Sequence, residues 1–295
     1  MIIPTVLPVI YGCEGLTLTP QEQKFFRKTQ PLGFILFERN CQTPKQIKTL
    51  IAQLKNCVRH SKVPILIDQE GGRVVRLKPP FWKARPAAKS FTSIDAVYQN
   101  ALSIAQELAE LGITVNCAPC ADLLIEGADG IIGDRSFSDD PAKVTEFSLA
   151  MLHGLEDGGI TPVIKHLPGH GRAPVDSHKE LPVVDLDHAS LSATDFVPFK
   201  ALAKASTIAW GMTAHVIYSD LDPDHVATQS SKVITKIIRG EIGFQGFLVS
   251  DCLTMKALSG SFTDKAKLSL NAGCDAVLMC KGTIAEFEDV AIGAA

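Results

Sequence analysis

The chain consists of short apolar runs that alternate with longer amphipathic stretches. The apolar runs are rich in Val, Ile and Leu, which is typical of strands buried on both faces of a parallel sheet. Eight such runs occupy residues 5–12, 33–39, 64–72, 113–123, 160–171, 207–216, 246–251 and 275–280. The amphipathic stretches begin at Thr19-Pro20, Thr43-Pro44 and Asp140-Pro141, or cover residues 93–111, 192–205, 231–242, 261–272 and 283–291. In the first group a capping side chain precedes a proline at the first helical position, so we expect helices there.

Eight strand–helix units in 295 residues predict an α/β fold, a single (β/α)8 TIM barrel that forms one domain over residues 1–295. An open doubly wound sheet is the structural alternative. No Gly-x-Gly-x-x-Gly sequence follows the first apolar run, so the barrel is favoured. The chain stops soon after the eighth run, at Ala295, and we therefore expect a short last helix and a weaker closing seam.

Polar side chains end almost every apolar run. Because the loops after the strands of a barrel build its active site, these residues should meet at one mouth of the barrel. They are Asp68, Asn116, Asp122, Lys165, His166, His215 and Asp251.

Composition excludes several classes of protein. The chain is 46% hydrophobic and 21% charged with a formal net charge of −3, which argues against general binding to nucleic acid or to a membrane surface. No apolar run approaches the roughly 20 residues of a membrane span, and the first residues lack the features of a signal peptide. The eight cysteines are scattered through apolar stretches, as expected of reduced thiols in a cytoplasmic protein. One Cys-x-x-Cys, at Cys117 and Cys120, has no second pair, so it is a weak signal for zinc or redox chemistry.

Two short motifs could carry acid, base or nucleophilic chemistry. Asp251 leaves an apolar strand and could either cap the next helix or act as a nucleophile or base. Asp176 precedes His178 by two residues, so its carboxylate could orient the imidazole and raise its basicity. Metal binding by His166, His170 and His178 is a competing interpretation. Lys165 would repel a cation there, and the Leu-Pro-Gly spacer prevents a one-face helical pair.

Cationic side chains recur in the loops that follow the third, fourth and fifth apolar runs. Each arginine among them could equally be a surface ion-pair partner. Around a cavity, however, such groups suit the binding of hydroxyls, amides or a carboxylate. They are Arg73, Arg76, Arg135 and Lys165.

Six motifs in order resemble glycoside hydrolase family 3, and more narrowly its single-domain bacterial β-N-acetylhexosaminidases, which recycle peptidoglycan. The resemblance covers residues 5–282. The motifs are IDQEGGRVVRL (67–77), GDRSF (133–137), KHLPGHGRAPVDSH (165–178), MTAHV (212–216), SDCLTM (250–255) and AGCDAVLM (272–279).

The resemblance implies a retaining, two-step hydrolysis of terminal β-linked N-acetylglucosamine from muropeptide fragments, without a metal or other cofactor. Asp251 would be the nucleophile, and His178, paired with Asp176, the acid/base. A neutral imidazole avoids repelling an anionic nucleophile, and its ordinary pKa of about 6.5 suits proton transfer near neutrality. The sugar-binding positions implied by the resemblance are Asp68, Arg76, Arg135, Lys165 and His166, with His215 as a further wall of the pocket.

The motif set departs from the family pattern at two positions. Leu167 replaces a common Phe and Cys252 replaces a common second Asp, which could change the polarity of a subsite.

The absence of a second domain after residue 282 favours the hexosaminidase branch over the larger β-glucosidases. A phosphorylase on the same scaffold, with phosphate in place of water, remains an alternative. A silent sugar-binding barrel is disfavoured because Asp251 and His178 are both present. We expect a monomeric enzyme with a small amino-sugar substrate.

Overall fold

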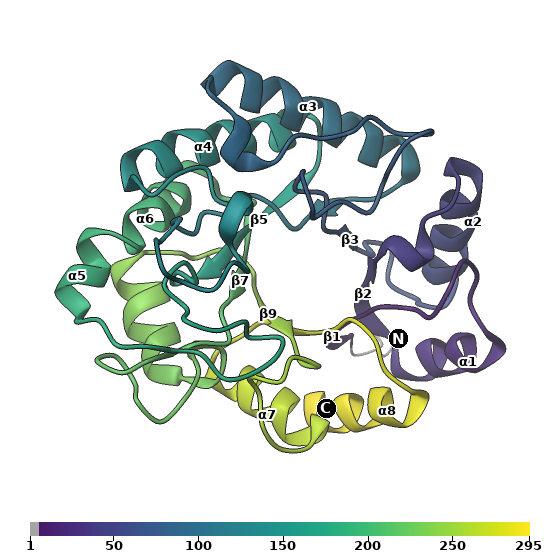
Figure 1. Ribbon diagram of the computed structural model, residues 1–295. Coiled ribbons are helices and arrows are strands. Elements are labelled where there is room, and N and C mark those ends of the chain that lie inside the picture. Colours follow the sequence, from purple (N-terminus) through teal and green to yellow (C-terminus); the bar gives the residue numbers. More distant parts are fainter. Residues whose placement is uncertain (1–5) are drawn as a thin grey trace.

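A closed barrel of eight parallel strands forms the centre of the computed structural model, which describes residues 6–295 (Figure 1). The strands follow one another around the barrel in the order β1-β10-β9-β7-β5-β4-β3-β2. The predicted (β/α)8 TIM barrel is therefore confirmed. The strands are β1 (Leu7–Tyr11), β2 (Pro31–Leu36), β3 (Ile65–Ile67), β4 (Val115–Asn116), β5 (Thr161–Leu167), β7 (Trp210–Thr213), β9 (Leu248–Cys252) and β10 (Ala276–Met279).

Helices surround the strands and cover their outer faces (Figure 1). The α-helices are α1 (Pro20–Thr29), α2 (Pro44–Lys55), α3 (Ile94–Leu111), α4 (Pro141–Asp157), α5 (His188–Ala193), α6 (Phe196–Ala205), α7 (Phe262–Ala272) and α8 (Ile284–Ala294). A π-helix, η5 (Val233–Glu241), takes the remaining place in the ring. Short 3-10 turns are η1 (Glu38–Asn40), η2 (Ala88–Ser90), η3 (Gly133–Arg135) and η4 (Ala227–Gln229). A separate two-stranded sheet pairs β6 (Val183–Val184) with β8 (Ile217–Tyr218).

The predicted helix starts are confirmed at all three X-Pro sites. The side chains of Thr19, Thr43 and Asp140 each accept a hydrogen bond from a backbone N–H of the first turn. Proline occupies the first turn in each case, where its missing N–H would have no helical partner.

Several boundaries differ from the sequence-based expectation. The predicted strand 113–123 is reduced to β4, because the Ala118 N–H bonds locally to the Asn116 carbonyl and Pro119 has no N–H to donate. The predicted helix 192–205 is two helices. The Thr194 hydroxyl donates to the Ser190 carbonyl, and Asp195 binds Arg172 instead of capping α6. Thr5, the first residue of the first predicted strand, lies outside the described residues.

The seam between the first and last strands is closed. Val9, Ile10 and Tyr11 on β1 pair in register with Val277, Leu278 and Met279 on β10. Helix α8 supports the seam, because the Tyr11 hydroxyl donates a 3.0 Å hydrogen bond to the Phe287 carbonyl. The expected weakness at this seam is therefore not observed.

Apolar side chains fill the interior of the barrel. Because successive side chains of a strand point to opposite faces, each strand gives one set to this interior and another to the helices. The interior cluster contains Ile10, Ile35, Leu66, Val115, Cys117, Val163, Met212, Val249, Ala276 and Leu278. No helix within residues 6–295 is long and apolar enough to cross a membrane.

Candidate active site

A cavity of about 420 Å³ lies at the C-terminal ends of the barrel strands. Polar side chains from six of the strands or from the loops that follow them reach this cavity, as expected for a TIM barrel. The structure therefore brings together most of the residues predicted from the sequence. Those lining the cavity are Asp68, Arg73, Arg76, Arg135, Lys165, His166, His178 and Asp251.

Asp251 lies near the end of β9, with its carboxylate partly exposed to the cavity. The backbone N–H of Cys252 donates a 2.7 Å hydrogen bond to Oδ1. Burial acts to raise the pKa of this carboxyl, but His166, His215 and the Cys252 N–H together hold it below its usual range. Asp251 does not cap the following helix, because α7 begins at Phe262 and its cap is Ser261. The carboxylate is therefore charged and available to a ligand.

Asp176 and His178 form a pair in the loop that follows β5. The Asp176 Oδ1 accepts two hydrogen bonds from His178, one from the backbone N at 2.8 Å and one from Nδ1 at 2.9 Å. Burial acts to raise the pKa of Asp176, but the bonds from His178 lower it. The His178 side chain is 59% exposed and lines the cavity. With Nδ1 engaged by Asp176, Nε2 is the nitrogen that remains for proton transfer.

An ion-pair network forms another wall of the cavity. The Lys165 ammonium lies 2.9 Å from Asp68 Oδ1 and 2.6 Å from Glu70 Oε1. Arg135 donates two hydrogen bonds, of 2.9 and 2.8 Å, to the same Glu70 carboxylate. Arg76 completes the network with a 3.2 Å contact to Asp68 Oδ2. Three cations and two carboxylates thus share one corner, and their side chains are at most 22% exposed.

The network keeps its members charged despite their burial. Burial acts to raise the pKa of Asp68, but Lys165 and Arg76 lower it below its usual range. In the same way Arg135 and Lys165 lower the pKa of Glu70. Burial acts to lower the pKa of Lys165, whereas Asp68 and Glu70 raise it above its usual range. The network therefore presents fixed charges and directed hydrogen-bond donors to a polar ligand.

Glu70 was missed by the sequence analysis. Its only signal was its place two residues after Asp68, in the same Gly-Gly turn. Its partners come from distant loops, so the chain order does not show that it links Arg135 to Lys165.

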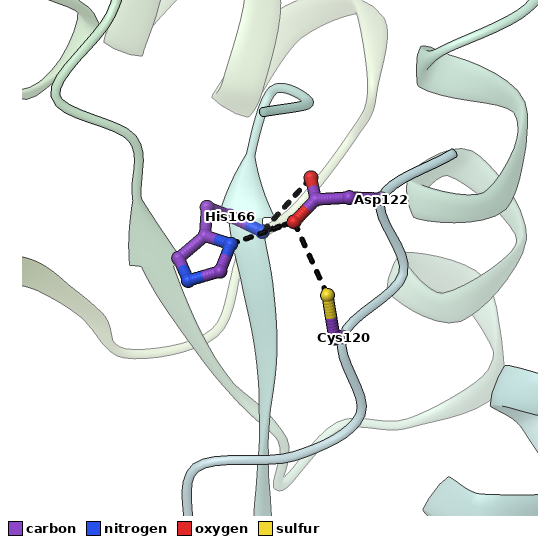
Figure 2. A group of neighbouring side chains, drawn as sticks. All are labelled: Cys120, Asp122 and His166. Atoms are coloured by element: carbon purple, nitrogen blue, oxygen red, sulfur yellow. Dashed lines mark hydrogen bonds and ion pairs between the residues drawn. The ribbon is translucent and has the colours of Figure 1, made fainter. Parts of the chain in front are cut away.

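Asp122 fixes His166 near the end of β5 (Figure 2) and His170 in the loop that follows. Its carboxylate accepts hydrogen bonds from His166 Nδ1 at 2.6 Å and from the backbone N of His170 at 2.6 Å. The His166 backbone N and the Cys120 thiol also donate to it. Burial acts to raise the pKa of Asp122, but His166 and His170 lower it to about 2. Asp122 thereby sets the orientation of the His166 ring, which lines the cavity.

The residues in Figure 2 do not fit a metal ion. Cys120, Asp122 and His166 are close enough to share one, but the Asp122 oxygens already accept several protein donors. Burial raises the pKa of the Cys120 thiol well above its usual range, and the thiol donates to Asp122. The three imidazoles of the alternative metal interpretation have separate partners. His166 contacts Asp122, His170 contacts Ser177, and His178 contacts Asp176.

His215 does not form part of the wall that we expected. It is fully buried, and its ring contacts the Thr228 hydroxyl at 2.7 Å and the Cys252 carbonyl at 3.1 Å. The ring therefore supports the backbone beside Asp251 from behind the cavity. Leu167 is also fully buried, in the core between β5 and the helices, so its difference from the family pattern affects packing. Cys252, in contrast, does line the cavity.

Comparison with known proteins identifies the family. Residues 14–292 match the N-terminal domain of glycosyl hydrolase family 3. The chain belongs to glycoside hydrolase family 3. It is 37% identical over 284 residues to a beta-hexosaminidase of Alkalilimnicola ehrlichii, covering 92% of this chain and 80% of the relative. A beta-hexosaminidase of Tolumonas auensis is 35% identical over 281 residues, with coverages of 92% and 82%.

Solved structures of the same family have the same fold. NagZ from Neisseria gonorrhoeae, in complex with N-trifluoroacetyl-D-glucosamine, has a TM-score of 0.88 and 34% identity, over 99% of this chain and 86% of that one. A beta-N-acetylglucosaminidase from Paenibacillus has a TM-score of 0.90 and 31% identity. The match covers 98% of this chain and 56% of the Paenibacillus chain. The family 3 chain described here is thus a glycoside hydrolase of the beta-hexosaminidase type.

Proposed function

We propose that this family 3 protein is a retaining exo-β-N-acetylglucosaminidase with Asp251 as nucleophile and His178 as acid/base. The observation that carries the proposal is that Asp251, on strand β9, and His178, in the loop after β5, line one cavity. One group is an ionised carboxylate and the other an imidazole oriented by Asp176. Such a pair supplies the two functions that a retaining glycosidase requires.

In the first step, an Asp251 carboxylate oxygen attacks the anomeric carbon of the terminal sugar. A covalent bond forms between that oxygen and the carbon while the glycosidic carbon–oxygen bond breaks. The proton on His178 Nε2 passes to the departing oxygen, so the aglycone leaves as a neutral alcohol. Asp176 stabilises the correct ring orientation by holding Nδ1 at 2.9 Å.

In the second step, water attacks the same carbon from the side that the aglycone has left. His178 Nε2 takes a proton from this water, and the bond to Asp251 breaks. The free sugar has the same anomeric configuration as the substrate because two inversions have occurred. His178 returns to its starting protonation state.

The ion-pair network is our proposed binding site for the N-acetylglucosamine ring. Asp68 can accept from sugar hydroxyls, whereas Lys165, Arg76 and Arg135 can donate to hydroxyl or carbonyl oxygens. His166, held by Asp122, is placed beside them. The Neisseria gonorrhoeae relative in complex with N-trifluoroacetyl-D-glucosamine supports an N-acylated glucosamine as the bound unit.

The finer identity of the substrate rests on the motif resemblance. The motifs resemble the peptidoglycan-recycling branch of the family, so we infer that muropeptide fragments carrying a terminal N-acetylglucosamine are the substrates. The eight cysteines are all unpaired, which supports a cytoplasmic location. A monomeric state is a prediction that light scattering can test.

Kinetics with a chromogenic N-acetyl-β-glucosaminide test the proposal, followed by trapping with a 2-fluoro sugar. We expect turnover by the purified chain and a covalent sugar adduct on Asp251 by peptide mass spectrometry. Absence of turnover, or an adduct on another residue, would contradict it. A purified muropeptide carrying a terminal N-acetylglucosamine then tests the substrate class separately.

The histidine acid/base favours a second candidate, a phosphorylase. A carboxylate in that position would repel an incoming phosphate, and an imidazole does not carry that negative charge. Phosphate would then attack the glycosyl-enzyme in place of water and release a sugar 1-phosphate. Product analysis with and without inorganic phosphate distinguishes the two, because a hydrolase gives the free sugar in both cases.

A further inference from the structure

Two cysteines lie side by side in the wall of the cavity. Cys252 is the last residue of β9 and directly follows Asp251, and Cys280 directly follows β10. The two strands pair in parallel, with Cys252 opposite Leu278. Both cysteines line the cavity with Asp251.

The contacts of Cys252 favour its thiolate. Its Sγ accepts a 3.3 Å hydrogen bond from the backbone N of Cys280 and lies 3.1 Å from the Thr254 hydroxyl. Hydrogen bonding from the Cys280 thiol lowers the pKa of Cys252, burial opposes this, and Thr254 and the Cys280 N–H lower it further, to about 7. A substantial fraction of Cys252 is therefore thiolate at neutral pH, and the thiolate is the nucleophilic form.

The neighbouring charges are compatible with this state. The Lys265 ammonium donates a 3.3 Å hydrogen bond to the Leu253 carbonyl. Burial lowers the pKa of Lys265, and the charge of Cys252 acts to raise it. Burial raises the pKa of Cys280, and Cys252, Asp68 and Asp251 raise it further, so Cys280 remains a protonated donor. Burial likewise raises the pKa of the other thiols: Cys13, Cys41, Cys57, Cys117, Cys120 and Cys274. Cys252 is thus the reactive thiol among the eight, with a second thiol beside it.

We propose that Cys252 and Cys280 form a peroxide-sensitive pair, and that oxidation of the pair to a disulfide inactivates the sugar site. The Cys252 thiolate attacks one oxygen of hydrogen peroxide. A sulfur–oxygen bond forms, the oxygen–oxygen bond breaks, and hydroxide leaves and takes up a proton. Cys280 then attacks the sulfenic sulfur, and water leaves with the Cys280 proton. Peroxide is reduced to water, and the two thiols are oxidised to one disulfide.

The disulfide acts on the site through the backbone of residue 252. The Cys252 N–H holds the Asp251 carboxylate at 2.7 Å, and His215 contacts the Cys252 carbonyl. Drawing Cys252 toward Cys280 displaces these contacts and, with them, the Asp251 carboxylate. Reduction of the disulfide restores them, so the inhibition is reversible.

Hydrogen peroxide treatment of the purified full chain tests this proposal. The activity of each variant is expressed relative to its own untreated sample, because Cys252 lines the cavity. We expect the initial rate of the parent to fall at least about ten-fold and to recover with dithiothreitol. Cys252→Ser should resist peroxide. Cys41→Ser is the matched control: Cys41 is more exposed than Cys252 and its pKa is raised to about 12, so this variant should be as sensitive as the parent.

Mass spectrometry gives a second result that does not depend on the proposed substrate. Peroxide-treated parent should show a Cys252–Cys280 cross-link, and Cys280→Ser should show a sulfenic acid on Cys252 that dimedone traps. The proposal is overturned if Cys252→Ser loses activity as the parent does, if the cross-link joins other cysteines, or if the cross-linked protein stays fully active. Failure of turnover in untreated protein contradicts the proposed hydrolase instead, and the cross-link can still be mapped.

Discussion

The Asp176 carboxylate accepts hydrogen bonds from both the backbone N and the ring Nδ1 of His178, at 2.8 and 2.9 Å. This double contact fixes the imidazole although its side chain is 59% exposed. His170 anchors the rest of the loop. Its backbone N donates to Asp122, and the His170 ring contacts the Ser177 hydroxyl. A proton carrier is thereby fixed in orientation while remaining open to a substrate.

Loss of the imidazole should reduce turnover according to how much the leaving group needs a proton. We expect His178→Ala to lower kcat by about 10²–10⁴-fold for a poor leaving group, and much less for a dinitrophenyl glycoside. Asp176→Asn should have a smaller effect with the same dependence on leaving group and an altered pH profile, because the ring remains but loses its orienting charge.

His225→Ala is the matched control for these variants. His225 is 58% exposed and contacts Asp222, three residues before it, so the pair resembles His178–Asp176 in exposure but lies outside the cavity. Its loss should leave kcat unchanged for every leaving group. Equal losses for good and poor leaving groups in His178→Ala would contradict the acid/base assignment.

Removal of the Asp251 carboxylate should abolish the covalent step. Asp251→Ala is expected to lower kcat by about 10³-fold or more while the protein unfolds at a temperature near that of the parent. Because the pKa of Asp251 is held below its usual range, the acidic limb of kcat/KM in the parent should lie below the ordinary aspartate pKa. Asp289→Asn, exposed on α8, serves as the control, and undiminished turnover in Asp251→Ala would remove Asp251 from the mechanism.

Neutralising Glu70 should weaken sugar binding. Glu70→Gln removes the charge that holds Lys165 and Arg135, so we expect KM to rise about ten-fold with a smaller change in kcat. Glu38→Gln is the control, because Glu38 contacts Lys78 in an exposed pair outside the cavity. An unchanged KM in Glu70→Gln would show that the network does not position the sugar-binding cations.

Acid should destabilise the fold through Asp122. Its pKa is about 2 in the folded protein against 3.8 for an ordinary aspartate, so protonation favours the unfolded chain. The resulting stabilisation, about 2 kcal/mol, is fully present above pH 4 and is lost as the pH falls toward 2. Urea unfolding at several pH values measures it. Asp122→Asn should be less stable than the parent at pH 7 and should lose less stability on acidification over this interval.

Chelation should leave activity unchanged. The Asp122 oxygens already accept donors from His166, His170 and Cys120, and the proposed proton transfers use only Asp251 and His178. Activity after dialysis against a chelator, with elemental analysis of the protein, checks this expectation. A loss of activity that added zinc restores would contradict it.

The architecture followed from local features of the chain. Alternating apolar runs and amphipathic stretches predicted eight units, and the Thr-Pro and Asp-Pro starts predicted where three helices begin. Short-range chemistry controls these features, because caps and apolar periodicity act over a few residues. The break between α5 and α6 was missed because it depends on Arg172, a residue from another loop that engages Asp195.

The candidate site likewise has features that the sequence predicted and features that depend on contacts between distant segments. The sequence by itself placed Asp68, Lys165 and Asp251 at strand ends, and in a parallel barrel all strand ends of one kind meet at one mouth. Apart from the Asp176–His178 pair, which the two-residue spacing predicted, only the tertiary structure decided which side chains contact each other there. It joined Glu70 to Lys165 and Arg135, placed His215 behind the wall, and set Cys252 beside Cys280. Strand pairing and loop packing between distant segments decide these contacts, and no pattern within a single segment encodes them.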